Sequence, residues 1–139
     1  MAYKIYFDVN VILDYTLQRS NFNDIEIIFN NIENGLHRGY LTSATLHTVS
    51  YFLSKEYKQK KVKEILLGIL STITVIDAPQ EILNTALQAN FNDIEDALQL
   101  YTALHYKMDF FLTSDKKLIL ENTRVLPILS ATEFVGTYC

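Results

Sequence analysis

Five short apolar, β-rich runs are spread along the chain, and segments with a helical pattern separate them. Short continuous apolar runs of this kind are typical of strands buried on both faces of a parallel sheet. The runs cover residues 4–7, 40–43, 73–76, 110–113 and 125–129. Strands that alternate with helices predict right-handed crossovers and helices on both faces of the sheet. The pattern therefore predicts an α/β fold, a three-layer α/β/α sandwich with a central, mainly parallel sheet.

The segments between these runs carry helix signals. Apolar residues recur at three- and four-residue spacing over residues 94–104, which predicts a helix with one buried stripe. Gly35 should close the helix before the second strand, and Pro79 fits the first turn of another. Ser130–Glu133 has the pattern of a capping box that opens a final helix. Pro127 should place the last strand at the sheet edge, where a missing amide donor is tolerated.

The pentapeptide Phe-Asn-Asp-Ile-Glu occurs twice, at residues 22–26 and 91–95. Each copy is most simply a helix start, with Asn23 or Asn92 as the cap. Only the second copy is followed by an acid, Asp96. We therefore expect the pentapeptide to be a capping signal and Asp96 to be the informative carboxylate.

Length and composition limit the possible classes of protein. The 139 residues suit one domain, residues 1–139, and 49% hydrophobic with 20% charged residues indicates an ordered globular chain. The lone cysteine excludes an intrachain disulfide, and neither a signal peptide nor an apolar run of about 20 residues is apparent. We expect a cytoplasmic protein with no membrane association. A net charge of −4 argues against coating nucleic acid by bulk attraction, but not against an enzyme that acts on it.

Carboxylates follow two of the predicted strands and open one of the predicted helices. Asp8 and Asp115 each end a strand, and Asp96 lies in the first turns of a helix, three residues after Asp93. The carboxyl ends of parallel strands converge on one rim, where ionised carboxylates repel unless a cation intervenes. Such oxygen ligands suit Mg²⁺ or Mn²⁺, and no Cys/His spacing suggests zinc. For any one of these acids alone, a turn or cap role is the simpler interpretation.

Four stretches of the chain resemble the PIN-domain family, and together they cover nearly its whole length. Ile5–Ile12 resembles the opening strand and D-x-N signature of that family. Asp93–Gln99 resembles its central acidic helix, and Phe111–Asp115 its T-x-D strand end. Pro127–Phe134 resembles its closing strand and helix.

The resemblance implies a metal-dependent endoribonuclease that hydrolyses phosphodiesters, commonly the toxin of a bacterial toxin–antitoxin pair of the VapC type. It implies Mg²⁺ or Mn²⁺ as cofactor, and RNA, a cognate antitoxin and a second copy of the chain as partners. By position it makes Asp8, Asp96 and Asp115 the metal ligands and Asp93 an auxiliary catalytic carboxylate. The expected supporting residues are Asn10, Ser43 and Thr113.

One position departs from the family pattern. The family usually has a glutamate in the helix after the second strand, and Thr48 stands there in this chain. A threonine cannot act as a carboxylate base, and our hypothesis is that Asp93 substitutes for the missing acid. Arg19 and Lys116 follow elements of the expected rim and are candidates to bind phosphate, although solvated loop charges would explain them too.

Two alternatives stay open at this stage. A PIN-like module could bind RNA or protein with impaired catalysis, because Thr48 replaces the usual acid. A receiver-like phosphotransfer domain would also hold Mg²⁺ in an acidic pocket, but it has no use for an acidic helix such as that over residues 93–96.

Overall fold

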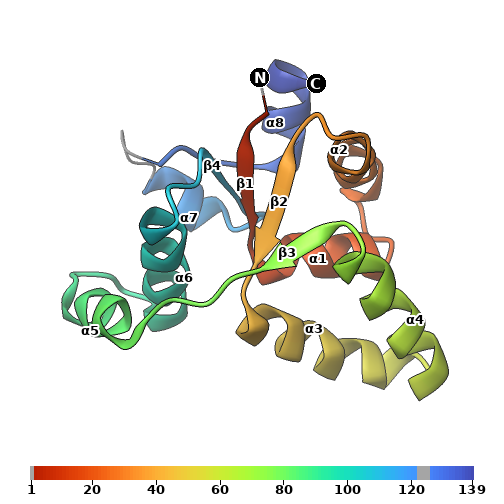
Figure 1. Cartoon of the computed structure of the whole chain (residues 1–139), viewed down its shortest axis with the longest axis horizontal. Coiled ribbons are helices and arrows are strands. Elements are labelled where there is room, and N and C mark those ends of the chain that lie inside the picture. The colour runs from red at the N-terminus through yellow and green to blue at the C-terminus, as the bar shows by residue number, and fades with distance from the viewer. Residues whose placement is uncertain (1, 122–125) are drawn as a thin grey trace.

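The fold is described from a computed structural model of the chain and covers residues 2–121 and 126–139 (Figure 1). Five parallel strands form one sheet in the order β3-β2-β1-β4-β5. The strands are β1 (Lys4–Phe7), β2 (Arg38–Leu41), β3 (Ile73–Val75), β4 (Phe110–Leu112) and β5 (Ile128–Leu129). The predicted parallel sheet is confirmed.

Helices cover both faces of this sheet. Over the described residues they are α1 (Val9–Thr16), α2 (Phe22–Glu33), α3 (Ser43–Glu56), α4 (Gln59–Leu70), α5 (Gln80–Gln88), α6 (Ile94–His105), α7 (Lys116–Leu120) and α8 (Ala131–Tyr138). Figure 1 shows α5, α6 and α7 on one side, and α1 to α4 with α8 on the other. The predicted three-layer α/β/α sandwich is confirmed.

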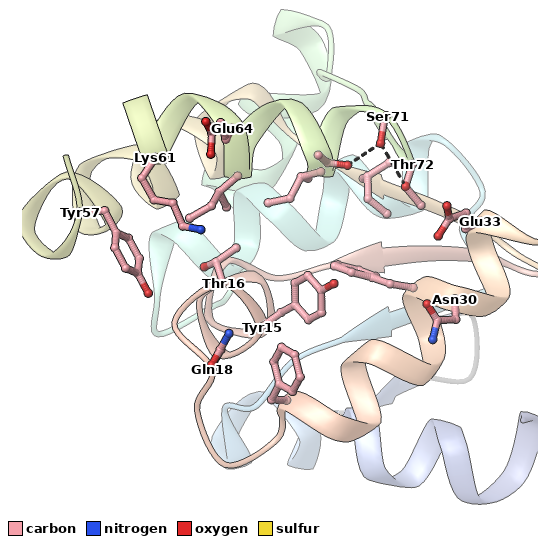
Figure 2. Close-up of a pocket in the computed structure, with 16 residues that line it drawn as sticks. Tyr15, Thr16, Gln18, Asn30, Glu33, Tyr57, Lys61, Glu64, Ser71 and Thr72 are labelled. Carbon is pink, nitrogen blue, oxygen red and sulfur yellow. Dashed lines mark hydrogen bonds between the residues drawn. The ribbon is translucent and has the colours of Figure 1, made fainter. Parts of the chain in front are cut away.

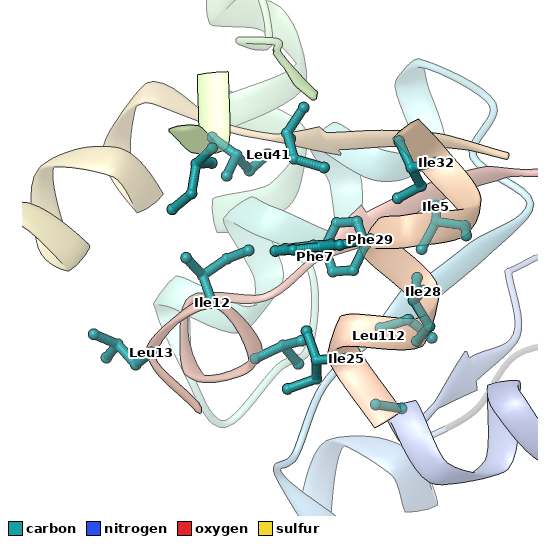
Figure 3. Packing of buried hydrophobic residues seen from close by; sticks show 14 of the residues in the cluster. Ile5, Phe7, Ile12, Leu13, Ile25, Ile28, Phe29, Ile32, Leu41 and Leu112 are labelled. Carbon is teal, nitrogen blue, oxygen red and sulfur yellow. The ribbon is translucent and has the colours of Figure 1, made fainter. Parts of the chain in front are cut away.

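Alternation along β1 divides the core into two halves. Ile5 and Phe7 are fully buried among side chains of α1, α2 and α3 (Figure 3), whereas Tyr6 packs on the opposite face with Leu100 of α6. The ring of Tyr6 stacks on that of Phe111 in β4, with centroids 5.0 Å apart. Because successive strand residues face opposite ways, a strand that is apolar throughout can only lie between two layers.

Gly39 lets a helix and two strands approach one another closely. A Cβ added there would lie 2.9 Å from Cδ1 of Ile32 in α2 and 2.9 Å from Cε2 of Phe7, and closer still to Cδ1 of Ile73. These three side chains are buried, so none has open space beside it into which it can turn. A residue without a side chain is therefore required at this point of β2.

Some of the expected element boundaries differ from those observed. The second strand was expected over residues 40–43, but it ends at Leu41, because Thr42 caps α3 by accepting a hydrogen bond from the backbone N–H of Thr45 at 3.2 Å. Val125, the first residue of the expected last strand, lies outside the described residues. The remainder of that strand, β5, pairs with β4 at the sheet edge, and the carbonyl of Pro127 accepts from the N–H of Phe111.

The capping predictions were partly right. Ser130 and Glu133 form the expected box, each side chain accepting from the other's backbone N–H at 3.1 Å. Gly35 follows the end of α2 with a φ of 79°, the left-handed conformation expected after a helix. Pro79 lies at the N-cap of α5, just before the predicted first turn.

The asparagine caps expected in the repeated pentapeptide are wrong in both copies. In the first copy α2 begins at Phe22, so Asn23 lies inside the helix. In the second copy the cap is Asp93, whose carboxylate accepts from the N–H of Asp96 at 3.0 Å. A charged oxygen at this position also interacts favourably with the helix dipole, which a neutral asparagine one residue earlier would do less well.

The strand order creates a crevice at one point of the rim. From β1 the chain crosses to β2 and β3 on one side, then returns past β1 to place β4 on its other side. In open α/β sheets ligands bind where the order reverses in this way, beyond the carboxyl ends of the strands. The carboxyl ends of β1 and β4 are therefore the place to look for a site.

Candidate functional site

Asp8 lies at the carboxyl end of β1 and caps α1, with only 3% of its surface exposed. One carboxylate oxygen accepts from the N–H of Val9 at 2.7 Å and from Nε2 of Gln99 at 3.0 Å. The other accepts from Oγ1 of Thr113 at 2.7 Å and from Nδ2 of Asn10 at 3.1 Å. A carboxylate has about four acceptor positions, so a cation could bind Asp8 only if one of these bonds were given up. Burial raises the pKa of Asp8, against the opposing effect of these four hydrogen bonds.

Asn10 and Thr113, both expected near the site, join the ends of β1 and β4. Nδ2 of Asn10 donates to Oγ1 of Thr113 at 3.3 Å, and Oδ1 of Asn10 accepts from the N–H of Ser114 at 2.9 Å. Oγ1 of Thr113 also accepts from the N–H of Asp115 at 3.1 Å. The two side chains therefore fix the loop after β4 against Asp8.

The other expected carboxylates stand around Asp8 on the same rim. Asp96 lies in the first turn of α6, and Asp115 caps α7 by accepting from the N–H of Lys117 at 3.0 Å. The pKa of Asp96 is raised to about 7, by burial first and then by the charges of Asp93, Asp8 and Asp115. The fold thus brings together four acids that are up to about a hundred residues apart in sequence, close enough to disfavour ionisation of Asp96.

These carboxylates have the chemistry of a site for a hard divalent cation, because all the donors are anionic oxygens. A nearby cation would also reverse the repulsion that raises the pKa of Asp96. Within residues 2–121 and 126–139, however, no three His, Cys, Asp or Glu side chains stand close enough together to hold a metal. The donor set fits Mg²⁺ or Mn²⁺ in kind, and the side chains stand apart in this conformation.

Gln99 and Glu95 belong to the site, and the sequence reasoning missed both. Gln99 is 7% exposed, and its amide nitrogen donates to Asp8 at 3.0 Å and to Oε1 of Glu95 at 3.1 Å. Its amide oxygen accepts from the hydroxyl of Tyr6 at 3.0 Å. Burial, followed by the charge of Asp8, raises the pKa of Glu95. The buried stripe expected over residues 94–104 began at Ile94, but Ile94 is 66% exposed and the buried face of α6 instead carries Gln99, Leu100 and Ala103. The expected stripe therefore gave no signal for Gln99.

Other expected site residues make contacts away from Asp8. The hydroxyl and N–H of Ser43 both donate to Oδ1 of Asp77, at 2.9 and 3.1 Å, beyond the end of β3. Arg19 follows α1 and lies 3.7 Å from a carboxylate oxygen of Asp14. Lys116 is the first residue of α7, next to the candidate centre.

Thr48, which stands where a glutamate was expected, lies on α3 with its hydroxyl turned to its own helix. It donates to the carbonyl of Ala44 at 3.1 Å. Asp93, our candidate to replace that acid, uses one carboxylate oxygen to cap α6.

Comparison with known proteins finds similarity at two levels. The family model described as a PIN domain matches residues 4–117. VapBC2 from Rickettsia felis, solved with a DNA fragment from its promoter, is 18% identical with a TM-score of 0.62, over 90% of this chain and 96% of that one. PAE2754 from Pyrobaculum aerophilum is 17% identical with a TM-score of 0.63, over 98% and 96%. At these identities the structural likeness establishes the fold.

No curated protein sequence matches the chain. Among the described helices, none is both long enough and apolar enough to pass through a membrane.

Proposed function

The chain belongs to the PIN domain family, and we propose that it is a metal-dependent endoribonuclease centred on Asp8, Asp96 and Asp115. The observation that carries this proposal is the set of four donors around the buried carboxylate of Asp8. A helix cap needs one such bond. Donors converging from α1, α6 and the loop after β4 hold an ionisable group far more firmly than capping requires, as is common for functional carboxylates.

We propose that Asp8, Asp96 and Asp115 would hold Mg²⁺ or Mn²⁺, with Asp93 beside them. A bound divalent cation supplies positive charge that stabilises the charge developing on the scissile phosphate. Asn10 and Thr113 keep Asp8 in one orientation, and Ser43, the first residue of α3, holds the segment after β3 through Asp77.

The proposed substrate is single-stranded or looped RNA, and the proposed unit of activity is the single domain of residues 1–139. The chain carries a net charge of −4, so RNA must be bound by local contacts rather than by bulk attraction. Lys116, next to Asp115, and Arg19, which is half exposed, are the proposed phosphate contacts.

The test is cleavage of single-stranded RNA by the purified chain with Mn²⁺ or Mg²⁺, before and after Asp8→Asn. We expect the variant to lose more than about 100-fold in rate, because losing a ligand should exceed the 10–100-fold cost of losing a residue that only orients one. Asp24→Asn is the matched control and should cleave normally, because this half-buried residue of α2 lies away from Asp8 and the amide keeps an oxygen to accept from Thr132. Undiminished cleavage by Asp8→Asn would refute the assignment.

The role of Asp93 is tested separately by Asp93→Asn, which keeps an oxygen to cap α6. If Asp93 replaces the glutamate absent at Thr48, this variant binds Mn²⁺ more weakly and cleaves more slowly. If both are unchanged, Asp93 is a cap alone.

We further propose that the chain is a cytoplasmic toxin restrained by a cognate antitoxin. The resemblance to VapC toxins and the structural likeness to VapBC2 support this. A hollow of about 480 Å³ between α1, α2 and α4 has aromatic walls, including Tyr15 and Tyr57, and Lys61 and Glu64 at its side (Figure 2). Aromatic residues combined with polar and charged neighbours are typical of protein–protein interfaces.

The antitoxin proposal is tested with the protein encoded beside this chain. That protein should bind the purified chain and suppress cleavage, and Lys61→Glu should weaken the complex if the hollow is used. Sedimentation of the isolated chain tests the proposed homodimer, for which Tyr51 and Phe52, both exposed on α3, are the proposed contacts.

A second candidate function is a PIN-like module that binds RNA or protein without turnover. The hydroxyl of Thr48, bonded to its own helix where a carboxylate was expected, favours it. Binding of RNA with no cleavage under any divalent metal would establish this alternative.

A further inference from the structure

A pocket of about 470 Å³ opens at the carboxyl ends of β1, β2 and β3, with Glu95 and Gln99 of α6 in its wall. It lies between the start of α3, the segment after β3, α5 and the middle of α6. Its volume falls within the range of about 300–1,000 Å³ that is typical of small-molecule sites. Leu83 of α5 and Leu98 of α6 contribute apolar walls.

The side-chain donors that line this pocket are already used within the protein. Thr48 and Thr102 each donate to the carbonyl one turn earlier in their helix, at 3.1 and 2.7 Å. Both amide hydrogens of Gln99 are given to carboxylates. The hydroxyls of Thr42 and Thr45 bond each other at 3.1 Å, and Thr42 also accepts from the N–H of Thr45. The side chains that line the pocket therefore offer a ligand mainly hydrogen-bond acceptors.

Two carboxylates add to this excess of hydrogen-bond acceptors. Glu95 accepts only from Gln99 among the described residues, and that bond uses one of its two oxygens. Asp77 likewise receives Ser43 on one oxygen. Among the residues that the structure describes, no Lys, Arg or His lines the pocket. Its walls therefore disfavour a phosphate and favour a flat group whose edge carries N–H donors.

We propose that this pocket binds the base of an unpaired guanosine in the RNA, with Glu95 as the residue that recognises it. This rests on the proposed ribonuclease function. The Watson–Crick edge of guanine carries two neighbouring donors, N1–H and the 2-amino group, which match the two oxygens of a carboxylate. Adenine and cytosine place an acceptor beside their amino group, and uracil places carbonyls on both sides of its N–H, so each would direct a lone pair at Glu95.

The position of the pocket links recognition to cleavage. Gln99 holds Glu95 and Asp8 through the same amide nitrogen, at 3.1 and 3.0 Å. A nucleotide whose base is bound at Glu95 would therefore lie beside Asp8, at the edge of the proposed metal centre. Guanosine binding would select the bond that is cut.

Binding can be measured apart from cleavage by using the metal-free protein with EDTA. Fluorescence anisotropy compares short oligouridine RNAs that carry one central guanosine, inosine or adenosine. Inosine lacks only the 2-amino group, so we expect guanosine to bind about tenfold more tightly, the value of one charge-assisted hydrogen bond. Glu95→Gln should abolish that difference. Glu81→Gln, an exposed change on α5, should retain it.

A second variant tests the pocket without changing charge. Ala44 is exposed at the start of α3 and lines the pocket, so Ala44→Leu should fill it and leave the core intact. We expect this variant to bind the guanosine strand no better than plain oligouridine. Equal affinity of the unchanged protein for guanosine and inosine would overturn the proposal. So would a guanosine preference that survives both variants, or competition by an arginine-containing peptide in place of RNA.

The outcomes also separate this proposal from the proposed function. A guanosine preference without cleavage on adding Mn²⁺ would support the pocket and refute the nuclease. Mn²⁺-dependent cleavage without a guanosine preference would do the reverse.

Discussion

Replacing Gly39 by alanine should destabilise the protein, because β2 has no room for a methyl group. The added Cβ would meet Phe7 and Ile32 at 2.9 Å and Ile73 at a still shorter distance. Overpacking of this kind costs about 1–3 kcal/mol. Alanine also reduces the conformational entropy of the unfolded chain, which stabilises the folded state by about 0.4–1 kcal/mol. We therefore expect a net loss of about 1–2 kcal/mol in the free energy of unfolding.

Gly68→Ala is the matched control. Gly68 lies inside α4, and a Cβ there meets nothing within 4 Å. Alanine is favoured over glycine inside a helix by about 0.5–1 kcal/mol, so this change should stabilise the protein. The same substitution should therefore lower the free energy of unfolding at position 39 and raise it at position 68, because only position 39 is closely packed.

Urea unfolding followed by circular dichroism gives both values, provided that the slope with denaturant stays constant. The midpoint should fall for the variant at position 39 and rise for that at position 68. A variant at position 39 that is as stable as the unchanged protein would refute the close packing of α2 and β3 around β2.

Three further predictions concern single side chains. Ser130→Ala removes the capping box of α8 and should cost about 1 kcal/mol in urea unfolding; an unchanged midpoint would contradict the cap. Burial lowers the pKa of His37 below 6.5, and its Nδ1 accepts from the N–H of Tyr3. The unfolded state therefore binds more protons, and stability should fall as the pH drops below about 6.5. His37→Phe should have a lower melting temperature than the unchanged protein. Between about pH 7.5 and about pH 5, however, its melting temperature should fall by less than that of the unchanged protein; equal falls would contradict the role given to His37. Thr113→Val removes the 2.7 Å donor to Asp8 and should weaken Mn²⁺ binding by about 10–100-fold in calorimetry, whereas unchanged affinity would show that the bond does not matter.

The parts of the site that the sequence could predict are those encoded next to strand ends. Asp8, Asn10 and Asp115 follow runs that are apolar throughout, and such runs can only be buried strands of a parallel sheet. In a parallel sheet the carboxyl ends of all strands lie at one edge, so the fold class predicts that these residues share that edge. Thr113 was expected there because residues 111–115 resemble the T-x-D strand end of PIN domains.

The remainder depends on contacts that no local pattern encodes. Gln99 reaches Asp8 across 91 residues, and its role is set by how α6 packs on β1. Its spacing from Asp96 marks the helix face but not the partner. The strand boundary at Thr42 was missed because one hydroxyl, bonded to the N–H of Thr45, starts α3 at Ser43, where the expected strand would still continue. Such competition between neighbouring elements is decided by tertiary packing.

The four donors around Asp8 also determine at which point of protein synthesis the hydrogen-bonded site around Asp8 can form. Two come from residues 9 and 10, but the others join Asp8 to residues 91 and 105 positions further along the chain. Pairings of such long sequence separation close late in folding. A ribosome that releases the chain before Thr113 has emerged would therefore release a fragment without an organised Asp8.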